Sequence, residues 1–346
     1  MNITINDIAK LCGCSRATVS RVLRSCKEVK PETRQKVLEI IEKHNYQPNQ
    51  MARNLARGFS NIIALIMGDI ASVSQIEIAK NIQRALDEAG YMTMLFDTES
   101  NNSLCDKALD AVVSNKFAGA FTVSTSGTPE KMRSFLKTKI PLVMVNRYEV
   151  SMDLDSVMMD DCDAAFRAAN QLLELGHRRI ALINGNKDVA SAINANMGYH
   201  MALKEIGVKE DDIYNVNVVR EMAFQTGLKI QTEKPDVTAV ICLTQEQAIG
   251  FLDSCLANKK QIPRDYSVFS LEATTRMFMG GFMFDTIGVS QELLGNTAVK
   301  KMLARLNEAR SNKAPDSAQE QYSRTVLMPI YYPGNSIGAR KSPPPD

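Results

Sequence analysis

The sequence has no tryptophan, only three histidines, and no apolar run near the roughly 18 residues of a membrane span. Its first residues, MNITINDIAK, place an acid and polar groups where a signal peptide has a basic and then an apolar stretch. It also lacks the GxSxG, HExxH and P-loop motifs, and His177, in the turn of LGHRR, is expected to be structural. These absences argue against a membrane protein and an enzyme, and they predict a cytoplasmic protein.

Cysteine occurs seven times, an odd number scattered along the chain, which favours reduced thiols over a disulfide framework. Cys12, Cys14, Cys26 and His44 lie near one another in the sequence, which leaves open a zinc site or a redox sensor. Their spacing matches no zinc signature, however, and cysteine readily fills small apolar positions. We therefore expect no metal and no cofactor.

The 346 residues are enough for two or three folding units at about 150 residues per domain. Residues 1–60 carry eleven lysines and arginines against five acids, a net charge of +6, so the rest of the chain carries −4 of the overall +2. A basic head on a mildly acidic body is typical of a nucleic-acid-binding module joined to another domain. The alternative is a solvated charged face.

The basic segment has the spacing of short helices. Apolar residues recur at helical intervals at Ile5, Ile8, Ala9 and Cys12. Thr4 and Asp7 form a capping box before them, Gly13 supplies a turn, and Ser15 caps a second helix that runs to about Arg24. A third helix is expected from Pro31 to about His44, and its buried residues are expected to be Val37, Ile40 and Ile41.

The second of these helices has two different faces. Apolar residues lie on one side at Val19, Val22 and Leu23. Polar and small residues lie within roughly 140° on the other side at Arg16, Ala17, Ser20, Arg21 and Arg24. Helix, glycine turn and helix form the helix-turn-helix motif, whose second helix enters the major groove of DNA. The alternative is an ordinary amphipathic surface helix.

Pro48 and Asn49 open a stretch, QMARNLAR, that Gly58 ends. It can form about two helical turns, too short to be stable alone in water, so we expect it to be helical only when something packs against it. It is a candidate hinge.

From Asn61 onward, apolar runs alternate with amphipathic stretches, which indicates parallel sheets built from βαβ units. Strands are expected at 62–67, 91–96, 119–123, 141–145, 157–159, 180–183, 216–219, 239–242 and 268–271. Helices are expected at 76–89, 104–115, 129–136, 161–175 and 197–206. The predicted fold is an all-α helix-turn-helix domain followed by an α/β core of two parallel-sheet subdomains, with a ligand cleft at the carboxyl ends of the strands.

The chain resembles the LacI/GalR family of bacterial transcription regulators. The resemblance rests on TINDIAKLCGCSRATVSRVL at 4–23, YQPNQMARNLA at 46–56, IPLVMVNR at 140–147, LGHRRIALI at 175–183 and IPRDYSV at 262–268. It implies a homodimer that binds a near-palindromic operator in double-stranded DNA. It also implies a core like that of periplasmic sugar-binding proteins.

The resemblance assigns roles to residues of the head. The family positions that contact bases correspond to Arg16, Ala17 and Arg21. The family positions that contact phosphates correspond to Ser15, Thr18, Ser20, Tyr46 and Asn49. Leu55 occupies the position of a minor-groove wedge, with Ala52 at the small-residue position of the same hinge. Thr4 and Arg24 complete the expected DNA interface.

The effector site keeps the family's positions but changes several side chains. The expected effector-binding residues are Ser74, Asn146, Arg147, Gln245 and Glu272. Ser74 replaces an aromatic residue, Asn146 replaces an acid, and Ala195 replaces the usual cleft arginine. The hydrogen-bonding groups that remain suit a small, polar, carbohydrate-like effector. The alternative is a cleft that binds weakly in a protein that responds to something else.

The expected domain limits are 1–47 for the DNA-binding domain, 48–60 for the hinge, 61–335 for the core and 336–346 for a flexible tail. Within the core, the first subdomain takes 61–160 and 290–320, and the second takes 161–289 and 321–335. The predicted function is a DNA-binding transcription repressor controlled by a small effector. A solute-binding protein of the periplasmic type is the alternative, but that class needs a signal peptide and has no basic head. The tail lacks a leucine heptad, so a dimer is expected.

Overall fold

The structure is a computed structural model that describes residues 3–23, 29–44, 46, 60–149, 152–205, 207, 212–273, 281–310 and 322–340. Two compact units divide the chain, a head at Met1–Ser60 and a core at Asn61–Asp346. The expected hinge, with Asn49, Ala52 and Leu55, lies outside the described residues, as does Arg24.

The head contains the three predicted helices: α1 at Ile5–Cys12, α2 at Arg16–Leu23 and α3 at Pro31–Lys43. Ile8, Val19 and Val37 are fully buried where the three helices meet. Ile40 and Ile41, expected to be buried, are only partly so. The apolar spacing therefore predicted the helices correctly but overestimated how much of α3 is buried.

The turns of the head also form as predicted. Thr4 and Asp7 make the capping box, with the Asp7 N–H 3.4 Å from the Thr4 hydroxyl and the Thr4 N–H 3.0 Å from the Asp7 carboxylate. Gly13 ends α1 at a φ of 67°, in the left-handed region that favours glycine. Ser15 caps α2, because its hydroxyl accepts a 3.1 Å hydrogen bond from the Thr18 N–H.

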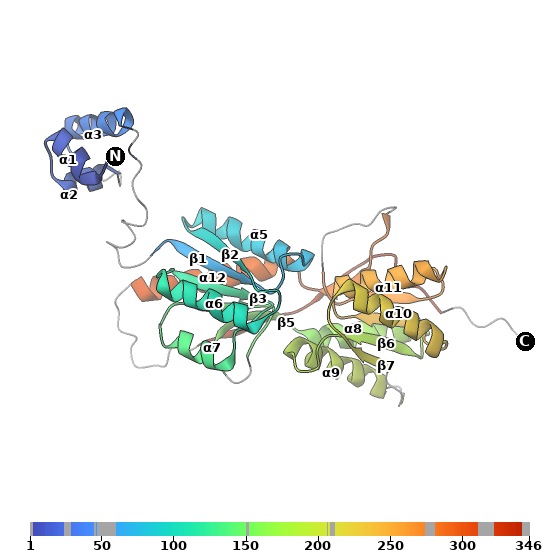
Figure 1. Cartoon of the computed structure of the whole chain (residues 1–346). Coiled ribbons are helices and arrows are strands. Elements are labelled where there is room, and N and C mark those ends of the chain that lie inside the picture. Colours follow the sequence, from blue (N-terminus) through green and yellow to red (C-terminus); the bar gives the residue numbers. More distant parts are fainter. Residues whose placement is uncertain are drawn as a thin grey trace, which may run out of the picture. The chain divides into compact units, whose positions relative to one another are not determined.

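The core contains two six-stranded sheets, each covered by helices on both faces (Figure 1). The strands of the first sheet, in spatial order, are β11 (Arg324–Leu327), β5 (Asp155–Met159), β4 (Leu142–Val145), β3 (Gly119–Val123), β1 (Ile62–Met67) and β2 (Met92–Asp97). All are parallel. We call this sheet and its helices the first lobe.

The second lobe is built in the same way. Its strands, in spatial order, are β12 (Ile330–Tyr332), β10 (Asp285–Gly288), β9 (Ser267–Ser270), β8 (Ala239–Cys242), β6 (Ile180–Asn184) and β7 (Asp212–Asn215). Only β12 runs antiparallel to its neighbour. The chain therefore forms the predicted pair of mainly parallel sheets.

Helices cover both faces of each sheet because successive residues of a strand point to opposite sides. In β1, Ile63 and Leu65 pack on one side and Ala64 and Ile66 on the other, and all four are buried. The helices of the first lobe are α5 (Val73–Glu88) and α12 (Gln291–Arg310) on one face, and α6 (Asn102–Ser114) and α7 (Pro129–Leu136) on the other. Those of the second lobe are α8 (Asp161–Glu174) and α9 (Ala190–Glu205), opposite α10 (Arg220–Glu233) and α11 (Gln245–Ala257).

The structure corrects one predicted strand. Residues 216–219 were expected to form it, but β7 lies earlier, at Asp212–Asn215. Asp212 is buried at the start of β7, where its carboxylate lies 2.7 Å from the Arg179 guanidinium and 3.2 Å from the Lys234 ammonium. A charged residue is a poor sequence signal for a strand. These tertiary ion pairs hold Asp212 in β7 and so fix where the strand begins.

The structure also corrects one subdomain limit. Residues 321–335 were assigned to the second subdomain, but β11 pairs with β5 and so belongs to the first lobe. The Asp155 carboxylate, at the start of β5, accepts a 3.0 Å hydrogen bond from the Ser323 N–H just before β11. It also lies 2.6 Å from the Arg305 guanidinium of α12. These contacts join segments far apart in the sequence, which is why the local pattern missed them.

No helix in the described part of the chain is long and apolar enough to cross a membrane. His177 is buried, as expected for a structural residue. Its ring nitrogens lie 2.8 Å from the Thr238 hydroxyl and 3.0 Å from the Ser267 hydroxyl. The six described cysteines are free.

Candidate DNA-binding helix and effector cleft

Helix α2 presents an exposed face that carries the residues predicted to read DNA bases. Arg16, Ala17 and Arg21 are exposed, whereas Val19 and Val22 on the opposite side are buried in the core of the head. No acidic residue occurs in α2, whose sequence is RATVSRVL. The exposed face therefore combines two positive charges with a small residue between them.

The residues predicted to contact phosphates lie around the start of α2 and beside it. Ser15 and Thr18 lie at the amino end of the helix, with their hydroxyl oxygens 2.9 Å apart. A helix amino end favours anions, because its first N–H groups have no partner within the helix. Ser20 is partly exposed, and Tyr46 packs against the head core. Thr4 is exposed, and its hydroxyl donates to the Asp7 carboxylate at 2.6 Å.

In the first lobe, two of the predicted effector residues directly follow a strand. Asn146 and Arg147 come immediately after β4. The Asn146 side-chain amide donates a 3.3 Å hydrogen bond to the hydroxyl of Ser124, which follows β3. Both residues adopt left-handed backbone, with φ of 56° and 54°. Such strained residues cluster at ligand-binding sites, and here they mark two adjacent strand ends.

Arg147 interacts electrostatically with Glu149 and Cys105. Its guanidinium lies 4.0 Å from the Glu149 carboxylate. Burial raises the pKa of the Cys105 thiol, in α6, to about 12, and the charge of Arg147 opposes part of that rise. Arg147 is therefore placed near α6.

Three other predicted residues meet between the two lobes. The Gln245 N–H, at the start of α11, donates a 3.1 Å hydrogen bond to the Glu272 carboxylate. Burial raises the pKa of Glu272, and hydrogen bonds from the Ser74 side chain and the Gln245 backbone oppose that rise. Ser74 belongs to α5 of the first lobe and is buried. The structure thus brings Ser74, Gln245 and Glu272 together.

Asp161, which was not among the predicted site residues, opens α8 directly after β5 and is only 7% exposed. Burial raises the pKa of its carboxyl to about 8, and the charges of Asp160 and Glu272 raise it further. The available signal was a pair of acids immediately after a predicted strand, at the strand end where α/β sheets bind ligands. Asp161 therefore lies near Glu272 and joins the candidate effector residues.

Comparison with known proteins places these sites in a family. Residues 4–49 match the model of the bacterial regulatory proteins of the lacI family. Residues 62–336 match the model of the periplasmic binding proteins and sugar binding domain of the LacI family. The chain belongs to the LacI family. This membership confirms the predicted family and fold class and makes the protein a DNA-binding transcriptional regulator rather than an enzyme.

Two curated relatives show how far the similarity extends. Catabolite control protein A of Priestia megaterium is 30% identical over 279 residues, which cover 79% of this chain and 83% of that protein. The HTH-type transcriptional regulator DegA of Bacillus subtilis is 27% identical over 343 residues, which cover 95% of this LacI-family chain and 96% of DegA. The similarity thus spans both head and core.

Solved structures show the same fold. A lac repressor dimer bound to operator and the anti-inducer ONPF matches with a TM-score of 0.84 at 21% identity, over 98% of this chain and 100% of that chain. The transcriptional regulator CelR in complex with cellobiose matches with a TM-score of 0.71 at 21% identity, over 96% and 99% of the two chains. At this level of identity the likeness concerns the fold alone.

Proposed function

We propose that this LacI-family regulator is a repressor that binds a near-palindromic operator as a homodimer and is controlled by a small polar effector in the cleft. The observation that carries the proposal is the exposed face of α2, with Arg16 and Arg21 opposite a buried apolar face. Arginine suits bidentate contact with guanine in the major groove, and hydroxyls suit phosphates. Since it acts on DNA, we place the protein in the cytoplasm.

The known functions and bound ligands of the relatives support this proposal. CytR of Escherichia coli, 28% identical over 274 residues, is an HTH-type transcriptional repressor. The lac repressor was solved as a dimer on its operator, and CelR was solved with the sugar cellobiose. The alternative, a periplasmic solute-binding protein, gives no role to the basic head or to the exposed arginines of α2.

The control mechanism depends on the hinge segment. In the proposal, residues 48–57 become helical on DNA, and Leu55 enters the minor groove beside Ala52. A change in the core that separates the two hinges of a dimer would then lower operator affinity. The effector is expected to bind through Ser74, Asn146, Arg147, Gln245 and Glu272, and we add Asp161 because it lies near Glu272.

The role of α2 in reading DNA bases can be tested by comparing two substitutions that each remove one positive charge. The target is the DNA site that the wild-type protein selects from a randomised pool. Arg21→Ala should weaken binding to that site about 10-fold to 100-fold and reduce discrimination against base changes, because a base contact is lost. Lys43→Ala, at the end of α3, should weaken binding to all DNA alike by a few fold. Fluorescence anisotropy at fixed salt measures both.

Leu55→Ala should weaken the complex while leaving the major-groove base preferences unchanged, because the wedge acts through DNA deformation. Equal affinity of wild type, Arg21→Ala and Leu55→Ala for the selected site would contradict the proposed mode of binding. An Arg21→Ala variant that loses affinity equally for every sequence would contradict base readout by α2.

A further inference from the structure

Two cysteines flank the turn of the helix-turn-helix. Cys12 ends α1 and Cys14 stands just before the Ser15 cap of α2, with Gly13 alone between them. Cys12 is 6% exposed and belongs to the core of the head, whereas Cys14 packs against that core and is partly exposed. The pair therefore joins the interior of the head to its surface at the point where α2 begins.

The backbone of the turn brings the two cysteines within disulfide range. Gly13 has a φ of 67° and a ψ of 31°, in the left-handed helical region. Because mirror-image dihedral angles give equal distances, the Cα atoms on either side of Gly13 have the separation of residues i and i+2 in an α-helix, about 5.4 Å. A disulfide joins Cα atoms that lie about 4.4–6.8 Å apart. The Cys14 N–H holds the turn closed by donating a 3.0 Å hydrogen bond to the Ala9 carbonyl.

The two thiols differ in reactivity. Burial raises the pKa of the Cys12 thiol, and the neighbouring Cys14 thiol raises it further through its charge and a hydrogen bond. The Cys12 thiol is therefore protonated at neutral pH and reacts slowly with oxidants. Cys14 is the more exposed of the two, so an oxidant reaches it first. An accessible thiol beside a second thiol that can resolve it is typical of redox-sensor cysteines.

From this geometry we infer that Cys12 and Cys14 form a reversible disulfide when hydrogen peroxide oxidises the protein, and that this disulfide lowers the affinity of the head for DNA. The Cys14 sulfur attacks one peroxide oxygen, the O–O bond breaks, and a sulfenic acid and water result. The Cys12 sulfur then attacks the Cys14 sulfur, so that the S–S bond forms, the S–O bond breaks and water leaves. In all, two thiols lose two electrons and two protons, and one peroxide becomes two waters.

The disulfide changes the packing at the start of α2. Bonded sulfurs lie about 2.0 Å apart, much closer than van der Waals contact, so the Cys12 sulfur must leave its place in the core or the turn must shift. α2 begins at Arg16, two residues after Cys14, and the Ser15 hydroxyl caps it. Either movement displaces Arg16 and Ala17, and the inference rests on the proposed function, which places these two residues against DNA bases. A ring closed over one residue is also strained, and strained disulfides are easily reduced.

The chemical step can be localised in a single peptide. Trypsin cleaves after Lys10 and Arg16 and releases LCGCSR, residues 11–16, which contains Cys12 and Cys14 and no other cysteine. The full-length protein is treated with hydrogen peroxide, its free thiols are blocked with iodoacetamide, and the digest is analysed by mass spectrometry without reduction. The peptide should be about 2 Da lighter than its reduced form and carry no iodoacetamide label. After dithiothreitol it should take up two labels.

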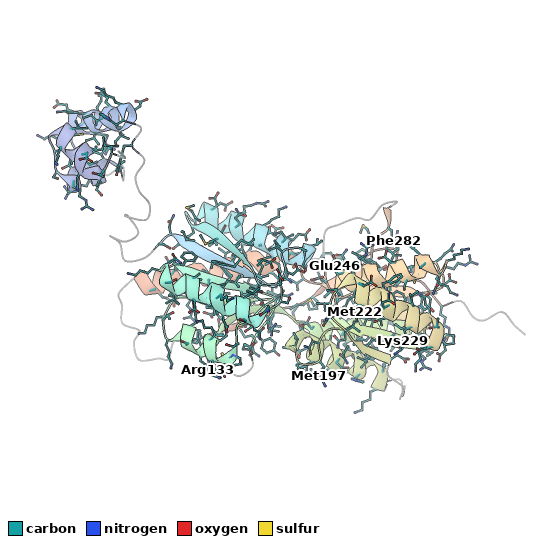
Figure 2. All side chains as sticks on the ribbon, in the orientation of Figure 1. Arg133, Met197, Met222, Lys229, Glu246 and Phe282 are labelled. Atoms are coloured by element: carbon teal, nitrogen blue, oxygen red, sulfur yellow. The ribbon has the colours of Figure 1, made fainter. Side chains whose placement is uncertain are left out.

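The same preparations are assayed for binding to the DNA site that the reduced wild-type protein selects. Peroxide should weaken binding about 10-fold or more, because base contacts of α2 are lost, and dithiothreitol should restore it. Peroxide also oxidises exposed methionines, such as Met197 of α9 and Met222 of α10, which Figure 2 labels on the second lobe. Methionine sulfoxide requires a dedicated reductase, so recovery with dithiothreitol assigns the effect to the thiols.

Three variants locate the effect. Cys12→Ala and Cys14→Ala, when reduced, should each bind the selected site within about 3-fold of wild type, because alanine also fills a small apolar position. Both should keep that affinity in peroxide, and two separate variants guard against a folding defect in one of them. The matched control is Cys26→Ala, which removes the third cysteine of the first 60 residues and should retain the full peroxide response.

The inference is overturned if peroxide leaves both thiols of the peptide free, if the disulfide forms without a change in DNA binding, or if Cys14→Ala responds to peroxide as wild type does. Loss of the response in Cys26→Ala would also contradict it, since the disulfide would then involve another cysteine. If the reduced wild-type protein selects no DNA sequence, the proposed function fails instead. The peptide mass still decides whether Cys12 and Cys14 form the disulfide.

Discussion

Asp161 lies where the surrounding core disfavours a charged carboxylate. Its pKa is raised from an ordinary value of 3.8 to about 8, first by burial and then by the charge of Asp160. Folding therefore favours the protonated form of this carboxyl. The stability that the protonated form contributes is fully present below about pH 4 and is lost as the pH rises through about 8.

Replacing Asp161 by asparagine should remove this pH dependence. We expect Asp161→Asn to be more stable than wild type, with a difference that grows by on the order of 3 kcal/mol between pH 5 and pH 9. Urea denaturation of both proteins at the two pH values measures the free energy of unfolding. A difference that is the same at pH 5 and pH 9 would contradict the assigned burial.

Residues whose roles depend on near neighbours in the sequence were predicted well. The Thr4 capping box, the Ser15 cap and the division of α2 into two faces all follow from spacings within one or two turns. Asp161 was missed because its burial depends on tertiary packing, which the local sequence pattern does not show. Ser74 and Glu272 were named, but the contact that brings them together required the fold.

At the scale of elements, β2 is an edge strand with an unusual surface. It lies at the end of the first sheet, and its side chains Met92, Met94 and Leu95 are 57%, 42% and 44% exposed. Exposed strands with large apolar side chains mark association surfaces. We propose that β2 forms part of the homodimer interface.

A charge on β2 should therefore separate the subunits. Leu95→Glu should shift the protein toward monomer in sedimentation and weaken operator binding by about 10-fold or more, since a monomer contacts one half-site. The control is Leu256→Glu, the same change on an exposed leucine of α11. If Leu95→Glu sediments as wild type does, β2 is not in the interface. A wild-type tetramer in dilute solution would contradict the expected dimer.

Elements were predictable where the apolar pattern was local and continuous. β1, β3 and β8 were expected at nearly their observed limits, because buried parallel strands are runs of apolar residues. β7 was displaced because Asp212 is held in the strand by Arg179 and Lys234. The edge strand β2 was also expected at nearly its observed limits, because its apolar run is continuous although its side chains are exposed.

At the scale of the molecule, the head and the core differ in net charge as well as in fold. The head, up to Ser60, carries +6, and the core carries −4. The two sheets were predicted from the alternation of strands and helices. The path of the chain between them was not, because β11 is fixed to the first lobe by Asp155, far away in the sequence.

The measurement that tests the central claim most directly is selection of DNA from a randomised pool by the full-length protein, followed by sequencing. A dimer that presents two copies of α2 should recover a near-palindrome of two inverted half-sites whose centres lie about one helical turn apart. Arg21→Ala should recover the same symmetry with relaxed base preference. Recovery of no preferred sequence, or of a single site without inverted symmetry, would contradict a dimeric repressor that reads DNA through α2.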